Sequence, residues 1–536
     1  MSLSVGHTET VVMRVWLVAT LVVVIVVAGL AGAALLAWPQ GSLAPSSSGI
    51  VQVSLPGFAG DVDGVQVVGS GGRPVQVVLR NGAVFPLGQL AQGRRLTVTV
   101  EIARPQWIGW LVGRRVTRTL AVVTPSAQPS ARLLSPKRGA HVVVPYSTPV
   151  ARVRIGRQRS RTLSTPASFV PLGRVAAGAT SSGTLLVAVA PRPWERLGAP
   201  VRVSWFVRGT KPQAELVVAP AAGAVLWPGG QLTLTFSRPV AEAIGSRLPR
   251  IGPATPGHWT QEDANTLVFE PGALGFPLGA ALHVTLPRPA LIGGRSSRVI
   301  TWHVRPGSEL RLQQLLARLD YLPLRWHSSA DPSKTPASEL AEAVRPPAGS
   351  FSWRYAKIPS SLTTLWRQGQ TNDITRGAVM EFENEHGMAT DGIAGPAVWR
   401  ALMKDDLADR LHLGGYSYVF VHATVPESLN LWHNGKVILT SPGNTGIPSA
   451  PTPFGTWPVF EHIPVGTMSG TNPDGTHYDD PGIRWISYFH GGDALHAFPR
   501  ASYGTPQSLG CVELPEDDAA KVWPYTPIGT LVTVES

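Results

Sequence analysis

The sequence predicts a multidomain protein that is mainly β, and three observations support this fold class. Its 536 residues are too many to bury around one hydrophobic core. Charged residues make up only 15% of the chain, whereas there are 56 glycines and 49 prolines, a composition that favours strands joined by turns over long helices. Most of the chain before residue 306 also alternates apolar and polar residues with the period of a β-strand.

The N-terminal segment from Val15 to Ala37 contains no charged residue. At about 1.5 Å per residue, it is long enough to cross a hydrocarbon core of roughly 30 Å. A cleavable signal peptide usually has an apolar region of only about 7–15 residues, although Ala-Gly-Ala at 31–33 is compatible with cleavage. We therefore expect residues 1–40 to form a cytoplasmic tip and a single transmembrane helix. Arg14 at the start of the segment favours a cytoplasmic N-terminus.

Three segments with β-type alternation follow a flexible tether at residues 40–49. We expect a β domain at 41–125 and immunoglobulin-like (Ig-like) β-sandwich modules at 126–210 and 211–306, which makes two or three such modules in all. The last two share a weak repeat, in which Pro136 and Gly139 match Pro220 and Gly223. Because no polar cluster with catalytic spacing precedes residue 306, we interpret these modules as spacers.

From residue 308 the hydrophobic period becomes helical, and we expect a small three-helix domain at 307–404. Its helices are predicted over 309–322, over 375–387 and from Pro396 onward. The second is expected to start with Thr375 as N-cap and to stop at Gly387. The residues expected to face the core are Leu312, Leu315, Leu316, Leu319, Ala378, Val379, Phe382, Val398, Trp399 and Leu402.

This helical segment resembles the small peptidoglycan-binding domain that is attached to many cell-wall enzymes. The resemblance rests on the three helix patterns and on the turn sequence MATDGIAG, and it covers residues 308–403 with an insertion near 326–361. A three-helix linker domain that binds nothing is the alternative interpretation, because function can diverge on a shared fold.

The C-terminal segment, residues 415–536, returns to strands and contains the single cysteine of the chain, Cys511. With no partner in the chain it cannot form an internal disulfide. A thiol becomes a useful nucleophile when a neighbouring base removes its proton. His496 lies fifteen residues earlier in the strand-like DALHA, whereas His490 precedes a Gly-Gly turn. A strand directs a side chain more rigidly than a turn, and we therefore predict that His496 is the base.

The residues just before Cys511 predict a tight loop at the nucleophile. Gly510 allows the backbone to bend so that its N–H groups converge on an oxyanion. Ser508 can orient the same loop through its hydroxyl. On paper, His477, Asp479, His490 and His496 could form a metal site, but their spacing matches no zinc motif, and we expect neither a metal nor a cofactor.

TPFGTWPV, an Ala-Leu-His strand and Ser-x-Gly-Cys about fifteen residues later together resemble the L,D-transpeptidases with a YkuD-like catalytic domain. Thr452–Thr456 match the family's TP-x-G-x strand, while His496, Ser508, Gly510 and Cys511 match its active-site positions. The resemblance covers residues 415–536 and implies a β-rich catalytic domain.

The resemblance also implies the reaction and its partners. Cys511 would attack the third residue of a donor peptidoglycan stem peptide and expel the terminal D-alanine. An amine of an acceptor stem would then resolve the thioester into a 3→3 cross-link, with His496 moving the protons. Hydrolysis of the thioester would make the enzyme an L,D-carboxypeptidase. The family's thioester chemistry further implies sensitivity to carbapenems, and Tyr478 is the nearest match to its substrate-binding aromatic residue.

Two residues depart from the family pattern. Leu509 stands where a histidine is common, and Glu513 replaces the usual Arg or Asn. A carboxylate near the thiol would raise its pKa, or it could bind the ammonium group of the acceptor. We therefore count Tyr478, His490 and Glu513 as candidate substrate-binding residues. A wall-binding structural protein with a decayed catalytic domain is the alternative function.

The net charge of +12 favours anionic envelope polymers as further partners. Because the chain shows no nucleic-acid motif, we expect no nucleic acid among them. Together these features predict a single-pass cell-membrane protein whose catalytic domain lies outside the cytoplasm, at the cell wall.

Overall fold

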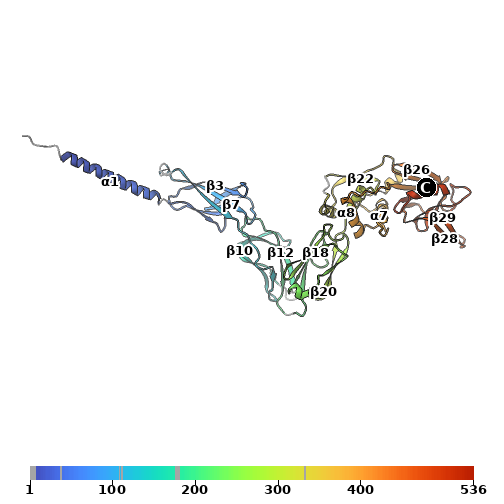
Figure 1. The fold of residues 1–536 in the computed structure, drawn as a ribbon, viewed down its shortest axis with the longest axis horizontal. Helices are drawn as coiled ribbons and strands as arrows, with labels where there is room; N and C mark the ends of the chain where they lie inside the picture. Colours follow the sequence, from blue (N-terminus) through green and yellow to red (C-terminus); the bar gives the residue numbers. More distant parts are fainter. Residues whose placement is uncertain are drawn as a thin grey trace, which may run out of the picture. The chain divides into compact units, whose positions relative to one another are not determined.

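The computed structural model describes residues 8–36, 39–107, 109, 113–174, 182–209, 211–330 and 334–536. The chain is mainly β and multidomain, as predicted, and it forms two compact units, Met1–Val217 and Val218–Ser536. Figure 1 follows the elements in sequence order, from helix α1 in blue to the C-terminal strands in red.

Helix α1 runs from Thr8 to Leu36. Its side chains are described from Trp16 to Leu30, which is shorter than the roughly 20 apolar residues that a spanning helix needs. Among the described residues, no helix is both long enough and apolar enough to cross a bilayer. The transmembrane helix predicted within residues 1–40 is therefore not supported, and Ala37, at its predicted end, lies outside the described residues.

The first β module consists of two four-stranded sheets, ordered β1-β2-β6-β5 and β4-β3-β7-β8. Val51 and Val84 from the first sheet and Val98 and Ile102 from the second belong to one buried core, so this module is a β-sandwich. Its strands are β1 (Ser42–Pro45), β2 (Val51–Ser54), β3 (Asp61–Gly69), β4 (Pro74–Val75), β5 (Val77–Arg80), β6 (Ala83–Pro86), β7 (Arg95–Ala103) and β8 (Arg115–Val123).

The next two modules depart from the Ig-like prediction of paired sheets. In the described part of 126–210 there is one five-stranded sheet, β11-β10-β12-β13-β9, and the described strands from β14 to β21 form one eight-stranded sheet. Irregularities near Val142 and Val150 interrupt the register of β10, and such bulges bend a strand so that one sheet can enclose its own core. The strands are β9 (Leu133–Leu134), β10 (His141–Ile155), β11 (Arg161–Arg174), β12 (Ser182–Ala190), β13 (Val201–Phe206), β14 (Glu215–Ala219), β15 (Val225–Leu226), β16 (Leu232–Phe236), β17 (Arg250–Gly252), β18 (Gly257–Asp263), β19 (Thr266–Pro271), β20 (Ala281–Ile292) and β21 (Arg295–Val304), with helix α3 (Val240–Ile244) after β16.

The three predicted helices of the next domain are confirmed as α4 (Glu309–Arg318), α7 (Asp373–Glu385) and α8 (Pro396–Leu407). All the residues predicted to face the core are buried in one cluster. The predicted N-cap is wrong, because the side chain of Asn372 accepts a hydrogen bond from the N–H of Thr375 and caps α7. The insertion forms β22 (Leu324–Ser328), α5 (Pro336–Val344), β23 (Gly349–Trp353) and α6 (Ser360–Leu365).

The C-terminal domain contains two sheets that share a core with helix α9. Their orders are β26-β25-β24-β32-β27 and β28-β29-β30-β31. Val421 and Val532 from the first sheet meet Leu495 and Val512 from the second in this core. The elements are β24 (Ser417–His422), β25 (Ser428–His433), β26 (Lys436–Pro442), β27 (Gly455–Pro458), β28 (Glu461–Thr471), β29 (His477–His490), β30 (Asp493–Ala497), β31 (Val512–Leu514), α9 (Glu516–Val522), the 3₁₀ turn η1 (Trp523–Tyr525) and β32 (Leu531–Glu535).

Candidate active site

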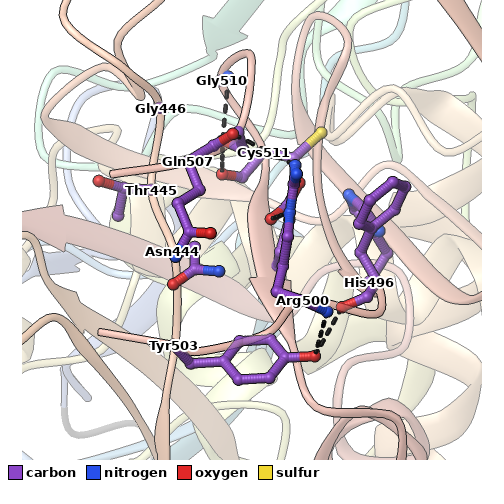
Figure 2. Close-up of polar contacts among 12 residues, drawn as sticks. Asn444, Thr445, Gly446, His496, Arg500, Tyr503, Gln507, Gly510 and Cys511 are labelled. Carbon is purple, nitrogen blue, oxygen red and sulfur yellow. Dashed lines mark hydrogen bonds and ion pairs between the residues drawn. The ribbon is translucent and has the colours of Figure 1, made fainter. Parts of the chain in front are cut away.

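Cys511 and His496 are brought together by the pairing of β30 with β31. These strands are parallel, with His496 opposite Glu513 and Leu495 opposite Val512. Because alternate residues of a strand share a face, Cys511, immediately before β31, lies on the same face as Glu513 and His496. Both Cys511 and His496 line one cavity of about 640 Å³, and Figure 2 shows both in that region.

The imidazole of His496 is held by the backbone. The side chain is buried, at 3% exposure, and Nδ1 lies 3.0 Å from the carbonyl oxygen of Ala497. A proton on Nδ1 donates to that carbonyl and leaves Nε2 as the basic nitrogen. Burial lowers the pKa of His496, and the positive charge of Arg500 acts in the same direction, against Ala497 and Glu513. The ring is therefore neutral at neutral pH.

The thiol of Cys511 is also neutral at rest. Burial raises its pKa to about 12, and the negative charges of Asp493 and Glu513 add to this effect, while the backbone N–H of Ala494 opposes it. Sγ also lies 3.8 Å from the carbonyl oxygen of Gly492, a long contact that the thiol proton can make. A neutral thiol beside a neutral imidazole requires the proton to move during attack rather than before it.

The loop before Cys511 is fixed by Ser508. Its hydroxyl donates to the carbonyl of Cys511 at 2.6 Å and accepts from the N–H of Gly510 at 3.2 Å. The N–H of Gly510 is thus occupied in this structure and does not point freely at an oxyanion, contrary to our expectation. Gly510 has a φ of +119°, and a Cβ added there would lie 2.2 Å from Oδ1 of Asp493. Only glycine fits this position.

Thr452, the threonine of the TP-x-G-x sequence, supports the same loop from another part of the chain. Its hydroxyl donates to the carbonyl of Gly510 at 2.8 Å and accepts from the N–H of Gly446, also at 2.8 Å. Sequence reasoning used Thr452 only as a family marker. The structure shows that the two halves of the motif, 452–456 and 508–511, are in physical contact.

Arg500 is a residue of the site that sequence reasoning missed. Its Nε donates to Oε2 of Glu513 at 2.8 Å and its Nη2 to Oε1 at 2.7 Å, a two-bond ion pair. Nη2 also reaches the carbonyl of Gln507 at 3.2 Å, in the loop that leads to the cysteine. Both oxygens of Glu513 are therefore occupied, which argues against our suggestion that it binds the acceptor ammonium group. The proximity of Arg500 to Glu513 depends on the fold and had no local signal.

The other candidate residues lie around the cavity at different distances from the reacting pair. Tyr478 lines the wall, as does Leu509, which presents an apolar side chain. His490 is 43% exposed and its Nδ1 lies 3.0 Å from Oδ2 of Asp493. Asp493 lines the cavity, so His490 contacts the site through that carboxylate. Among the described residues, no three His, Cys, Asp or Glu side chains are grouped closely enough to hold a metal ion.

The geometry agrees with the family comparison. Residues 417–534 match the family of the L,D-transpeptidase catalytic domain. These residues are an L,D-transpeptidase catalytic domain. Residues 364–402 match the family described as "Putative peptidoglycan binding domain", which includes α7 and α8 but not α4.

Solved structures similar to this chain are also L,D-transpeptidases. One is from Mycobacterium smegmatis, with 16% identity over 60% of this chain and 100% of that one, and a TM-score of 0.20. Another is L,D-transpeptidase 3 from Mycobacterium tuberculosis, with 13% identity, 60% and 99% coverage and a TM-score of 0.21. A third is the catalytic domain from E. faecium, with 27% identity, 23% and 99% coverage and a TM-score of 0.21. No curated protein matches the chain.

The protonation states of the L,D-transpeptidase domain predict how its thiol titrates. Because the pKa of Cys511 is raised to about 12, the thiolate fraction should keep increasing well above pH 9, whereas an ordinary cysteine titrates near 8.5. We expect the alkylation rate of the protein by iodoacetamide to rise through pH 10 without a plateau. Intact mass measures this rate without ambiguity, since Cys511 is the only cysteine.

Asp493→Asn is the matched variant for this titration. Since the charge of Asp493 raises the pKa of Cys511, its removal should lower that pKa and shift the alkylation profile to lower pH. Glu516→Gln, an exposed carboxylate on α9, should leave the profile unchanged. A wild-type plateau near pH 8.5 would contradict the raised pKa.

Proposed function

We propose that this protein is a peptidoglycan L,D-transpeptidase that forms 3→3 cross-links through a thioester on Cys511. The observation that carries the proposal is the placement of Cys511 and His496 on one face of two paired strands, in one cavity. The peptidoglycan-binding and transpeptidase families of this chain identify peptidoglycan as a partner. An enzyme that acts on peptidoglycan works at the cell wall.

In the first half of the reaction, Sγ of Cys511 attacks the carbonyl carbon of the third residue of the donor stem. The thiol proton passes to Nε2 of His496 as the C–S bond forms. The hydrogen bond from Nδ1 to the Ala497 carbonyl keeps the ring in the orientation that receives this proton and stabilises the imidazolium. Imidazolium then donates the proton to the departing amine of D-alanine as the C–N bond breaks, leaving the thioester.

In the second half, the amine of an acceptor stem attacks the thioester carbonyl. Neutral His496 removes one proton from that amine and returns it to the sulfur as the C–S bond breaks, which restores the thiol. The high pKa of the Cys511 thiol makes the free thiol the stable product form. Water can enter the same step in place of the amine, and the enzyme then acts as an L,D-carboxypeptidase.

The charges of the cavity support substrates that carry ammonium groups. Asp480, Asp493 and Glu513 line it together with Arg500, and Arg500 is neutralised by its two bonds to Glu513. Asp480 and Asp493 are left as carboxylates facing the cavity. Both the diamino acid of the donor and the amine of the acceptor carry positive charge before reaction, and such carboxylates attract them.

A carbapenem tests the nucleophile directly. We expect incubation of the full-length protein with a carbapenem to add the mass of one acyl group to the intact protein, and Cys511→Ala to show no adduct. Exposed His490 is a suitable control, so His490→Ala should still be acylated. A folded wild-type protein that forms no adduct would favour the wall-binding structural alternative and reject a reactive Cys511.

The reaction outcome needs its own measurement, because acylation alone does not distinguish transfer from hydrolysis. Incubation with a disaccharide-tetrapeptide, followed by mass spectrometry, should give 3→3 cross-linked dimers. A product consisting of tripeptide alone would assign L,D-carboxypeptidase activity to the same cysteine and contradict the cross-linking proposal.

A further inference from the structure

A second cavity lies in the third β module, within the unit Val218–Ser536, and has a volume of about 790 Å³. The segment after α3 and the strands β17, β20 and β21 contribute to its wall. The arginines that line it are Arg247, Arg250, Arg288 and Arg298.

Strand pairing brings two of these arginines together from separate segments. Arg250 on β17 lies opposite Thr285 of β20, and Thr285 lies opposite Val299 of β21, next to Arg298. The guanidinium of Arg298 is anchored, since its Nε donates to the carbonyl of Leu286 at 3.3 Å. These two side chains thus start from neighbouring rungs of one sheet.

The other two arginines meet at the loop after α3. Gly245 has a φ of +81°, and a Cβ added there would lie 3.4 Å from Nη2 of Arg288. The guanidinium of Arg288, from β20, therefore packs against the loop that carries Arg247. All four arginines are exposed, so their charges face the solvent that fills the cavity.

No acidic side chain balances these charges in the cavity. Its described lining contains no Asp or Glu, and within the residues that the structure describes none of the four arginines shows an ion pair. Glu242 on α3 is the nearest acid in sequence, but it is exposed and is not part of the lining. Four unbalanced positive charges around one hollow create a field that attracts anions.

The shape and chemistry of the lining restrict the anion. Guanidinium groups bind phosphate and carboxylate oxygens through paired hydrogen bonds. A tetrahedral phosphate presents oxygens in several directions and so suits guanidiniums that approach from several segments, whereas a carboxylate presents two oxygens in one plane. The described lining has no aromatic side chain, while proteins that bind single-stranded nucleic acid stack the bases on aromatic rings.

We propose that this arginine cavity binds a phosphate-bearing polymer of the cell envelope that carries no nucleobases. Its volume is in the range of sites for sizeable ligands, roughly 300–1,000 Å³, and so can hold more than one phosphate group. The third β module then attaches the enzyme to an anionic wall component, in addition to the peptidoglycan contacts of the two following domains. This binding does not require the catalytic proposal to be correct.

Calorimetric titration of the full-length protein with long-chain polyphosphate tests the proposal. The double variant Arg247→Gln/Arg288→Gln should weaken binding at least about tenfold, which is roughly 1.4 kcal/mol. Arg73→Gln/Arg295→Gln removes the same charge from exposed positions outside the cavity lining and should change affinity by less than about twofold. Arg247→Lys/Arg288→Lys keeps the charge, and partial recovery with an unchanged melting temperature would show that the loss is not unfolding.

Three other ligands separate the alternatives. Equal weakening by both glutamine pairs would reduce the effect to general charge attraction and overturn the cavity proposal. Polyglutamate binding as tightly as polyphosphate would overturn the phosphate assignment, and inorganic phosphate binding with the polymer's affinity would overturn the polymer. Single-stranded DNA that binds more tightly than polyphosphate would assign the cavity to nucleic acid instead.

Discussion

Replacing His496 with alanine is expected to reduce cross-linking by about 10³-fold, the range that a positioned acid–base group contributes. The thiol has a pKa raised to about 12, so almost none of it ionises unaided at neutral pH. Without Nε2 of His496 there is no described group on the same face of β30 and β31 to accept its proton. The measurement is the rate of dimer formation from disaccharide-tetrapeptide, together with the rate of carbapenem acylation.

His490→Ala is the matched histidine control and should retain most of the activity. Its ring is bonded to Asp493 and does not line the cavity within the described residues. The pH profile adds a second criterion. Because the pKa of His496 is lowered below 6.5, the wild-type acylation rate should fall only below that pH and stay level from about pH 7 to 9. Equal losses in the two variants would show that the base is not His496.

Arg500→Ala is expected to destabilise the catalytic domain by about 3 kcal/mol, because it leaves the charge of Glu513 buried without a partner. Glu513 is 5% exposed and receives two hydrogen bonds from Arg500. The same substitution removes the bond to the Gln507 carbonyl and loosens the loop before Cys511. Urea unfolding, followed by tryptophan fluorescence, measures the change in the free energy of unfolding.

The double variant Arg500→Ala/Glu513→Gln separates charge from packing. It removes the unpaired carboxylate, and we expect it to recover at least half of the lost stability. Lys521→Ala, which breaks an exposed pair with Asp518, should cost less than about 1 kcal/mol. An Arg500→Ala protein as stable as the wild type would show that Glu513 is solvated or protonated in the folded state.

Much of the local structure followed from side-chain periodicity. The leucine pattern around Leu315 and the Gly395-Pro396 start of α8 both predicted helices that the structure contains. Asn434-Gly435 predicted the turn between β25 and β26, and both residues have positive φ, 47° and 92°. These signals are local, since the residues that form each element lie within a few positions of one another.

The errors arose where a distant or competing contact decided the outcome. Asn372 capped α7 in place of Thr375 because an asparagine side chain was available one turn earlier. Alternating residues correctly predicted strands in 126–306, but alternation does not specify how strands are grouped. Bulges and pairing between remote segments produced single sheets where separate pairs were expected.

By itself the sequence determined the chemical participants, namely one cysteine, a strand histidine, a glycine before the nucleophile and an orienting serine. Only the tertiary structure decided how they are used. The parallel pairing of β30 with β31 places Cys511 and His496 on one face, the Ala497 carbonyl selects the basic nitrogen, and Arg500 occupies Glu513. Proton affinities depend on burial and on neighbouring charges, and both are properties of the folded chain.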